Sequence, residues 1–158
     1  MRRSALQVDD VKLRRPRAQS FDGLVAYAVR VASFATAREQ PAQTRLGLIV
    51  SSNFFDVLQI GLATGRAFRA EEDVADAPVP VVVLSHVLWT QHYAADPAVI
   101  GRTISLDNVP FTVIGVAPEN FGGITGNRVD LWAPLPTFPL VMGASSDWLT
   151  RSEACCAT

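Results

Sequence analysis

The segment VPVVVLSHVLW, residues 79–89, joins a continuous apolar run to a stretch in which apolar residues recur at helical spacing. A short apolar run that begins after Pro78 and ends at Ser85 predicts a strand covered on both of its faces. The helical pattern then continues, and Asp96-Pro97 should end it, because proline disfavours the α conformation in the residue before it. A serine between a strand and a helix is also where many hydrolases carry their nucleophile.

The surroundings of Ser85 favour a helix cap over catalysis. The nucleophile elbow of a hydrolase has glycine two residues before and two residues after the serine, because its turn is tight and strained. This chain has Val83 and Val87 there, and β-branched side chains would clash in such a turn. As an N-cap, the Ser85 hydroxyl would accept a backbone N–H of the first helical turn and stabilise the helix by about 1 kcal/mol. We therefore predict a cap, with a small hydrolase that uses Ser85 as an alternative hypothesis.

The flanking sequence predicts further strands and one short helix. Residues 24–34 alternate loosely between apolar and small or polar residues, which indicates a strand and leaves a helix as an alternative. Ser51 or Ser52 is expected to cap a short helix that places Phe54 and Phe55 on one face. The other predicted elements are a loop at 38–44, a strand at 45–50, an exposed excursion at 61–78, a glycine-rich loop at 117–128 and a short strand at 130–135.

Residues 101–116 alternate in two arms that meet at Asp107-Asn108, and this pattern predicts a β-hairpin. Both turn residues tolerate the positive φ that a tight hairpin turn requires. Pro110 has no backbone N–H, so we expect the second arm at a sheet edge, or Pro110 just after the turn. The order of elements predicts an α+β fold: a mixed β-sheet with short helices packed on it, βαβ-type units and one hairpin.

Composition places the chain among globular proteins. Its 158 residues are 49% hydrophobic and 18% charged, too apolar for a disordered protein. No apolar run approaches the roughly 20 residues that cross a bilayer, and the N-terminus lacks the apolar core of a secretory signal. Six of the 14 basic residues fall within 1–17, which predicts a basic, poorly ordered leader. The acidic remainder has no aromatic residues between arginines, which argues against nucleic-acid binding.

Residue types that bind metals occur in spacings that do not favour a metal site. Four carboxylates in residues 71–76 lack the alternating spacing and central glycine of a calcium loop. Two adjacent cysteines without a nearby histidine do not make a zinc site, and a disulfide between neighbours is strained. We expect both cysteines in an exposed tail. The residues concerned are Glu71, Glu72, Asp73, Asp76, Cys155 and Cys156.

The remaining candidates for chemistry also have simpler interpretations. His86 and His92 are six residues apart, whereas a zinc pair on a helix is four apart. Glu119 and Asp130 form a carboxylate pair only if the fold removes both from solvent, which the sequence gives no reason to expect. The glycines of the 117–128 loop are followed by neither a Gly-Lys-Ser/Thr motif nor a helix, so we expect turns instead of a phosphate site. These glycines are Gly122, Gly123 and Gly126.

Taken in order, five segments resemble one known family. They are FDGLVAY (21–27), VSSNFFDVLQIGLATGRAF (50–68), EED (71–73), the long segment 79–121, and DLWAPL (130–135). Together they are similar to the MacB-like periplasmic core domain of FtsX-like ABC transporter permeases, including the duplicated orphan type. The resemblance covers about residues 18–140. Matching positions are Asn53, Phe54, Phe55, Gly65, Arg66, Phe68, Ser85, Trp89, Asp96, Pro97, Gly101, Arg102, Gly115 and Pro118.

The sequence also departs from the family pattern. Glycine is usual where this chain has Gln59 and Asn108, although asparagine tolerates the left-handed conformation, so the hairpin turn is kept. Such permeases have one transmembrane helix before this domain and three after it, and the chain as given contains none of these. The tail at 141–158 contains SSDWLTRSEACCAT (145–158), which begins like the family's next helix and then stops. We therefore expect a fragment, with an incomplete domain at 18–140 and a truncated tail.

The resemblance implies a non-catalytic role, with no catalytic residue, cofactor or metal. In the family an ABC ATPase subunit drives the permease from the cytoplasm, and the extracytoplasmic domain moves in response during export or efflux. The implied partners are that ATPase, the transmembrane segments of the full-length permease and an extracytoplasmic protein, and the implied location is the periplasmic face of the cell membrane. The chain lacks a Walker A motif, which agrees with ATP hydrolysis elsewhere. A stand-alone soluble binding module and a non-functional remnant are the alternatives.

Overall fold

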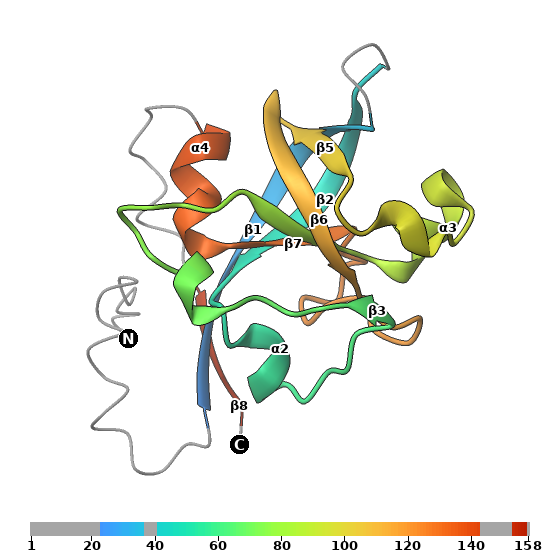
Figure 1. Ribbon diagram of the computed structural model, residues 1–158. Helices are drawn as coiled ribbons and strands as arrows, with labels where there is room; N and C mark the ends of the chain where they lie inside the picture. Colours follow the sequence, from blue (N-terminus) through green and yellow to red (C-terminus); the bar gives the residue numbers. More distant parts are fainter. Residues whose placement is uncertain (1–22, 37–40, 143–152, 158) are drawn as a thin grey trace.

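The computed structural model describes residues 23–36, 41–142 and 153–157. Their strands join in one mixed sheet in the order β2-β7-β4-β6-β5-β1-β8, with β3 paired to β6 (Figure 1). The strands are β1 Gly23–Ala35, β2 Gln43–Val50, β3 Thr64–Gly65, β4 Val81–Leu84, β5 Thr103–Leu106, β6 Val109–Val116, β7 Leu131–Pro134 and β8 Glu153–Ala157. The helices are α2 Phe54–Val57, α3 His86–Tyr93 and α4 Phe138–Met142, with 3₁₀ turns at Ala70–Glu72, Pro97–Val99 and Leu135–Thr137. The predicted α+β fold is confirmed, and residues 24–34 form a strand.

Strand β1 closes the sheet on itself. It pairs antiparallel with β2 from Tyr27 to Phe34, and Phe34 and Ala35 also pair with β5. In the sheet order, β2 and β5 are separated by β7, β4 and β6, and β1 pairs with both of them. Strands β1, β2, β7, β4, β6 and β5 therefore form a closed ring. Two neighbouring pairs in this ring are parallel, β2 with β7 and β4 with β6. The second pair, connected through α3, is a βαβ-type unit.

Strand β4 is buried on both faces, as its continuous apolar run predicted. Val82 and Leu84 belong to a core cluster that receives side chains from all six strands of the ring. Val81 and Val83 point the other way, into a second cluster that contains Trp132 and the residues of α2. The first cluster therefore fills the ring, and the second lies between the ring and the segments that cover it.

Ser85 caps helix α3, which confirms the prediction from the sequence. Its backbone is extended, and its Oγ accepts a hydrogen bond of 3.1 Å from the Leu88 N–H. The helix ends at Tyr93, slightly earlier than Asp96-Pro97 requires, because Ala94 adopts the left-handed conformation with φ 50°. Asp96 then caps the following 3₁₀ turn, with its Oδ1 accepting from the Ala98 N–H at 2.9 Å.

The predicted hairpin is present as β5 and β6. Asp107 and Asn108 both have positive φ, 48° and 68°, as a tight turn between twisted strands requires. Pro110 lies just after the turn, opposite Ser105. Of the two alternatives for Pro110, the sheet edge is wrong, because β6 also pairs with β4 and is therefore an inner strand.

The predicted caps of helix α2 are wrong. Asn53 occupies the N-cap position and makes no side-chain cap hydrogen bond. The Ser51 Oγ instead accepts from the Ala26 N–H at 3.1 Å, and the Ser52 Oγ donates to Asp73 at 3.1 Å. Both serines are buried by segments distant in sequence, so they join α2 to β1 and to the excursion instead of capping the helix.

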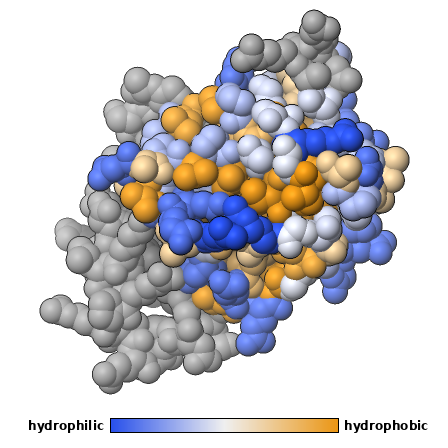
Figure 2. All heavy atoms as spheres, in the orientation of Figure 1, coloured by the Kyte–Doolittle hydropathy of each residue, from blue (hydrophilic) through white to orange (hydrophobic). Residues whose placement is uncertain are grey.

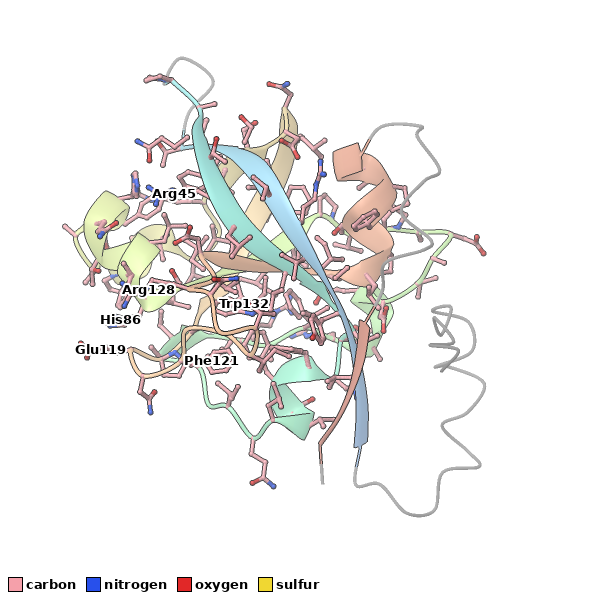
Figure 3. All side chains as sticks on the ribbon, turned by 180° about the vertical axis from the view of Figure 1, so that it is seen from behind. Arg45, His86, Glu119, Phe121, Arg128 and Trp132 are labelled. Atoms are coloured by element: carbon pink, nitrogen blue, oxygen red, sulfur yellow. The ribbon has the colours of Figure 1, made fainter. Side chains whose placement is uncertain are left out.

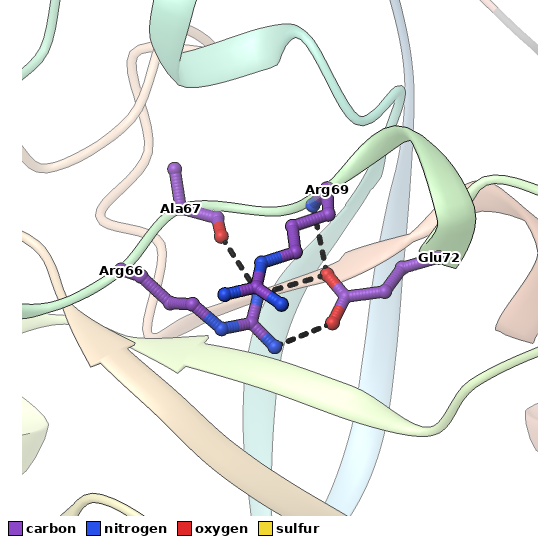
Figure 4. A network of polar contacts seen from close by, with 4 residues as sticks. All are labelled: Arg66, Ala67, Arg69 and Glu72. Atoms are coloured by element: carbon purple, nitrogen blue, oxygen red, sulfur yellow. Dashed lines mark hydrogen bonds and ion pairs between the residues drawn. The ribbon is translucent and has the colours of Figure 1, made fainter.

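Residues 61–78 are only partly the exposed excursion that the sequence predicted, because Phe68 and Glu72 are buried. Glu72 receives two hydrogen bonds from the Arg66 guanidinium, at 2.6 and 3.1 Å, and one from the Arg69 N–H at 2.9 Å (Figure 4). Burial alone would raise the pKa of Glu72, but the Arg66 guanidinium and the Arg69 N–H together hold it below its ordinary value. We call Arg66, Arg69 and Glu72 the excursion clamp.

The surface and the C-terminal end complete the fold. Figure 2 shows a band of apolar residues across one face, with hydrophilic residues on both sides of it. The backbone of β8 pairs antiparallel with β1 at Gly23–Tyr27, so this part of the expected tail forms a strand. No helix within the described residues has the length and apolar character that a bilayer crossing needs.

Candidate functional site: the cleft at the start of helix α3

A cleft lies where helix α3 begins beside the loop between β6 and β7. The Ser85 N–H donates to the Asp130 carbonyl at 2.8 Å, and the Ala117 N–H donates to the Leu84 carbonyl at 2.8 Å. These two bonds hold both ends of the loop against the end of β4. Between loop and helix is a volume of about 170 Å³, lined by Ser85, His86, Val87, Glu119, Asn120, Phe121, Gly122, Arg128 and Val129.

The glycine-rich loop is held in a defined shape by turns. The Phe121 N–H donates to the Pro118 carbonyl at 3.0 Å, and the Val129 N–H donates to the Gly122 carbonyl at 2.8 Å. Gly123 has φ 109°, and a Cβ at this position would lie 2.7 Å from a methyl group of Val129. The expectation that glycine serves turn formation here is therefore confirmed for Gly123, and Gly126, with φ 76°, follows the same rule.

The loop covers the outer core cluster with an aromatic side chain. Phe121 stacks on Trp132, with ring centroids 5.4 Å apart and an interplanar angle of 24°. Trp132 is fully buried and also contacts the edge of Phe55 at 5.8 Å. One wall of the cleft thus rests on the packed aromatic residues of the domain, which fixes its position relative to α3.

Glu119 and Arg128, the charged side chains at the cleft, are both exposed. Figure 3 shows His86, Glu119, Phe121 and Arg128 on the same side of the structure. The half-buried ring of His86 packs edge-on against Trp89 at 5.4 Å. Within the described part of the chain, neither Glu119 nor Arg128 forms an ion pair or a side-chain hydrogen bond. Four other arginines are paired with carboxylates: Arg30–Asp107, Arg45–Asp130, Arg66–Glu72 and Arg102–Asp96.

The two histidines of α3 have different surroundings. The His92 Nε2 lies 2.8 Å from an Arg45 guanidinium nitrogen, and its ring packs against Phe34 at 5.6 Å. Because a guanidinium group can only donate, His92 Nε2 is the acceptor in this contact. His86 faces the cleft instead.

The described residues contain no group of three or more histidine, cysteine, aspartate or glutamate side chains that could hold a metal ion.

The cleft contains no arrangement that would make Ser85 reactive. Its Oγ is engaged by the Leu88 N–H, and the residue is only 3% exposed. Glu119 lines the cleft, whereas Asp130 is not among its lining residues and lies 4.0 Å from Arg45. The two carboxylates are therefore not brought together for acid–base chemistry. The arrangement is suited to holding a small polar group and not to activating a nucleophile.

Sequence reasoning missed Arg128 and Asn120 as cleft residues, and no local pattern marks them. They reach the cleft because the loop folds back between β6 and β7. It also missed the excursion clamp, although a signal existed. Arg66 and Glu72 are six residues apart and lie in two of the segments that resemble the family, 50–68 and EED at 71–73.

Comparison with known proteins places the chain among transporter domains. A family model described as the MacB-like periplasmic core domain matches residues 1–152. A probable export ATP-binding/permease protein MacB of Pseudomonas entomophila is 35% identical over 89 residues, 56% of this chain and 13% of the relative. The macrolide export ATP-binding/permease protein MacB of Shigella dysenteriae is 30% identical over 145 residues, 84% of this chain. The chain spans only 22% of the length of that relative.

Solved structures share the fold. The periplasmic region of MacB from Actinobacillus actinomycetemcomitans superposes with a TM-score of 0.71 at 20% identity, covering 97% of this chain and 65% of that one. The extracellular domain of the noncanonic ABC-type transporter YknZ from Gram-positive bacteria gives a TM-score of 0.70 at 16% identity, covering 96% and 72%. At these identities the likeness concerns the fold alone.

Proposed function

The chain belongs to the MacB-like periplasmic core domain family, and from this premise we propose that it transmits conformational change within an ABC-type export permease. In this role the domain is non-catalytic. Displacements of the transmembrane segments, driven by an ABC ATPase, pass through it to an extracytoplasmic partner. The relatives named for export support the direction of transport.

The closed ring of strands is the observation that carries this proposal. A domain that transmits displacement must move as one body, so its parts must resist sliding past one another. In the ring each of the six strands is hydrogen-bonded to a strand on both sides. Core clusters lie both inside the ring and on its outer face. Interiors packed in this way have low compressibility and pass strain on to their neighbours.

The engagement of Ser85 as a cap further supports a non-catalytic role. A nucleophilic serine needs a neighbouring base that takes its proton. Here the Ser85 Oγ accepts a backbone N–H, and the residue is nearly inaccessible. A serine-directed covalent probe is therefore expected to leave Ser85 unmodified, and stoichiometric labelling would instead support a hydrolase.

The test is an export assay on the permease that contains this domain, reconstituted with its ATPase in vesicles. Val83→Asp places a charge in the buried core cluster on the outer face of the ring, and Thr112→Asp makes the same change at an exposed position of the adjacent strand. We expect Val83→Asp to abolish export while ATP hydrolysis continues, and Thr112→Asp to leave both unchanged. Full export by a permease from which the domain has been deleted would overturn the proposal.

We also propose that the chain is one part of a longer permease. The support is the small share of each curated relative that it spans, 13 to 22%. The DNA on either side of the reading frame tests this directly. Codons for apolar stretches of roughly 20 residues on both sides would support it. Stop codons with unrelated neighbouring sequence would favour a stand-alone binding module or a remnant.

A further inference from the structure

Two opposite charges line the cleft at the start of α3 without being neutralised by the protein. Glu119 and Arg128 both border the cleft, yet within the described residues neither has an ion-pair partner. They do not pair with each other, because the structure has no contact between them within 4.0 Å. Both side chains are exposed, whereas four arginine–carboxylate pairs elsewhere meet directly, as in the excursion clamp. The cleft therefore presents a separated positive and negative group to whatever enters it.

The size of the cleft limits what can bind there. The cleft has a volume of about 170 Å³. Pockets for drug-sized ligands measure roughly 300 to 1,000 Å³. The cleft is thus too small for a large transported compound, and it suits a molecule of a few heavy atoms.

The remaining lining specifies the chemistry between the two charges. Phe121 and the methyl groups of Val87 and Val129 offer apolar contact, while Asn120 and His86 offer hydrogen bonds. Phe121 is fixed by its stacking on Trp132. A ligand with a cationic group near Glu119, an anionic group near Arg128 and a small apolar body between them would satisfy both charges together.

We propose that this cleft binds a small zwitterion of the free α-amino acid class, with a short apolar side chain. Its ammonium group pairs with Glu119 and its carboxylate with Arg128, and its side chain lies against Phe121. The site is open to solvent and the ligand is small, so we expect a dissociation constant on the order of 1 mM. This inference does not depend on the proposed role in transport.

The test is a titration of the 158-residue chain, labelled with ¹⁵N, with alanine, N-acetylalanine and alaninamide. N-acetylalanine lacks the ammonium group, and alaninamide lacks the carboxylate. We expect saturable amide shifts at His86, Asn120 and Gly122 with alanine, and at least about tenfold weaker binding of each blocked compound. Absence of saturable shifts with alanine at about 50 mM, roughly fifty times the expected dissociation constant, would overturn the proposal, as would equal binding of all three compounds.

Variants separate the cleft from general surface charge. Glu119→Gln and Arg128→Gln should each weaken alanine binding by about tenfold. Glu71→Gln and Arg69→Gln make the same changes at exposed positions that do not line the cleft, and should leave binding unchanged. Glu119→Asp and Arg128→Lys keep each charge and should retain part of the affinity. Equal loss in the cleft and control variants would contradict the assigned site.

Discussion

Two segments cover the outer face of the ring, the excursion at residues 61–78 and the loop at 117–130, and they use their charges in opposite ways. In the excursion, Glu72 is buried and bound by Arg66 and the Arg69 backbone. In the loop, Glu119 and Arg128 stay unpaired at a cleft. Both segments pack aromatic side chains on the same core cluster. The difference indicates that the charges of the excursion clamp serve folding, whereas Glu119 and Arg128 are left for the binding that we propose.

The largest effect is expected from removing the aromatic contact that both segments share. Phe55 is 1% exposed and contacts Phe68 of the excursion, Phe121 of the loop and Trp132 beneath them. Phe55→Ala should destabilise the domain by about 4 kcal/mol, because it leaves a cavity in the core. Urea unfolding followed by fluorescence measures the change. A loss below about 1 kcal/mol would mean that the two segments do not share this support.

The excursion clamp should have the next largest effect. Glu72→Gln keeps the size of the side chain but removes the charge that Arg66 and the Arg69 N–H stabilise. We expect a loss of about 2 kcal/mol in the free energy of unfolding, reduced from the value of a fully buried pair because Arg66 is partly exposed. Glu71→Gln, at the exposed neighbouring position, serves as the control and should change stability by less than about 0.5 kcal/mol.

The clamp also predicts how stability depends on pH. The pKa of Glu72 is held below its ordinary value of 4.5 in the folded domain. The unfolded chain therefore takes up this proton first, so the stabilisation is present above that value and is lost as pH falls through the folded pKa. Urea unfolding between pH 7 and pH 3 should show a steeper loss for the unmodified chain than for Glu72→Gln. Parallel curves would indicate that Glu72 does not contribute.

The cap of α3 should have a smaller effect. Ser85→Ala removes the acceptor of the Leu88 N–H and should cost about 1 kcal/mol, visible as a lower Tm. Ser85→Asp restores an acceptor at the same position and should recover most of the loss. Equal destabilisation by both substitutions would show that burial of the serine matters more than the cap.

The cleft charges should have the smallest effect on stability, which is what distinguishes them from the clamp. Glu119→Gln and Arg128→Gln break no ion pair, so each should change the free energy of unfolding by less than about 0.5 kcal/mol. The same urea titrations measure this. A loss comparable to that of Glu72→Gln would mean that the cleft charges are structural, and the comparison between the two segments would fail.

Features that depend on neighbouring residues were predictable from the sequence. The apolar run of β4, the cap at Ser85 and the turn at Asp107-Asn108 each follow from local chemistry, and the structure has all three. Features that depend on distant residues were not. Ser51 looked like a helix cap, but its hydroxyl accepts the N–H of Ala26, which lies 25 residues away. A local sequence pattern does not show that a backbone N–H so distant in sequence will donate to this hydroxyl.

The same division applies to the closure of the ring and to the cleft. Closure depends on the pairing of Phe34 with Leu106, and nothing in either local sequence specifies it. Residues 71–76 were predicted to be exposed because four carboxylates so close together favour solvent, but Arg66 pairs with one of them, Glu72, which is buried. Arg128 reaches the cleft only through the path of its loop. The family resemblance supplied the expected role of the domain, but it specified neither the closure of the ring nor the cleft.

The most direct test of the account is a distance measurement within the domain while the permease works. Spin labels at Asp56 on α2 and Gln91 on α3, with Cys155 and Cys156 replaced by serine, report the distance across the ring by pulsed electron resonance. A third label in the transmembrane region reports how the domain moves as a whole. We predict that the distance between Asp56 and Gln91 is the same with and without ATP, while distances to the membrane change. A change within the domain, with its position in the membrane constant, would contradict transmission by a stiff body.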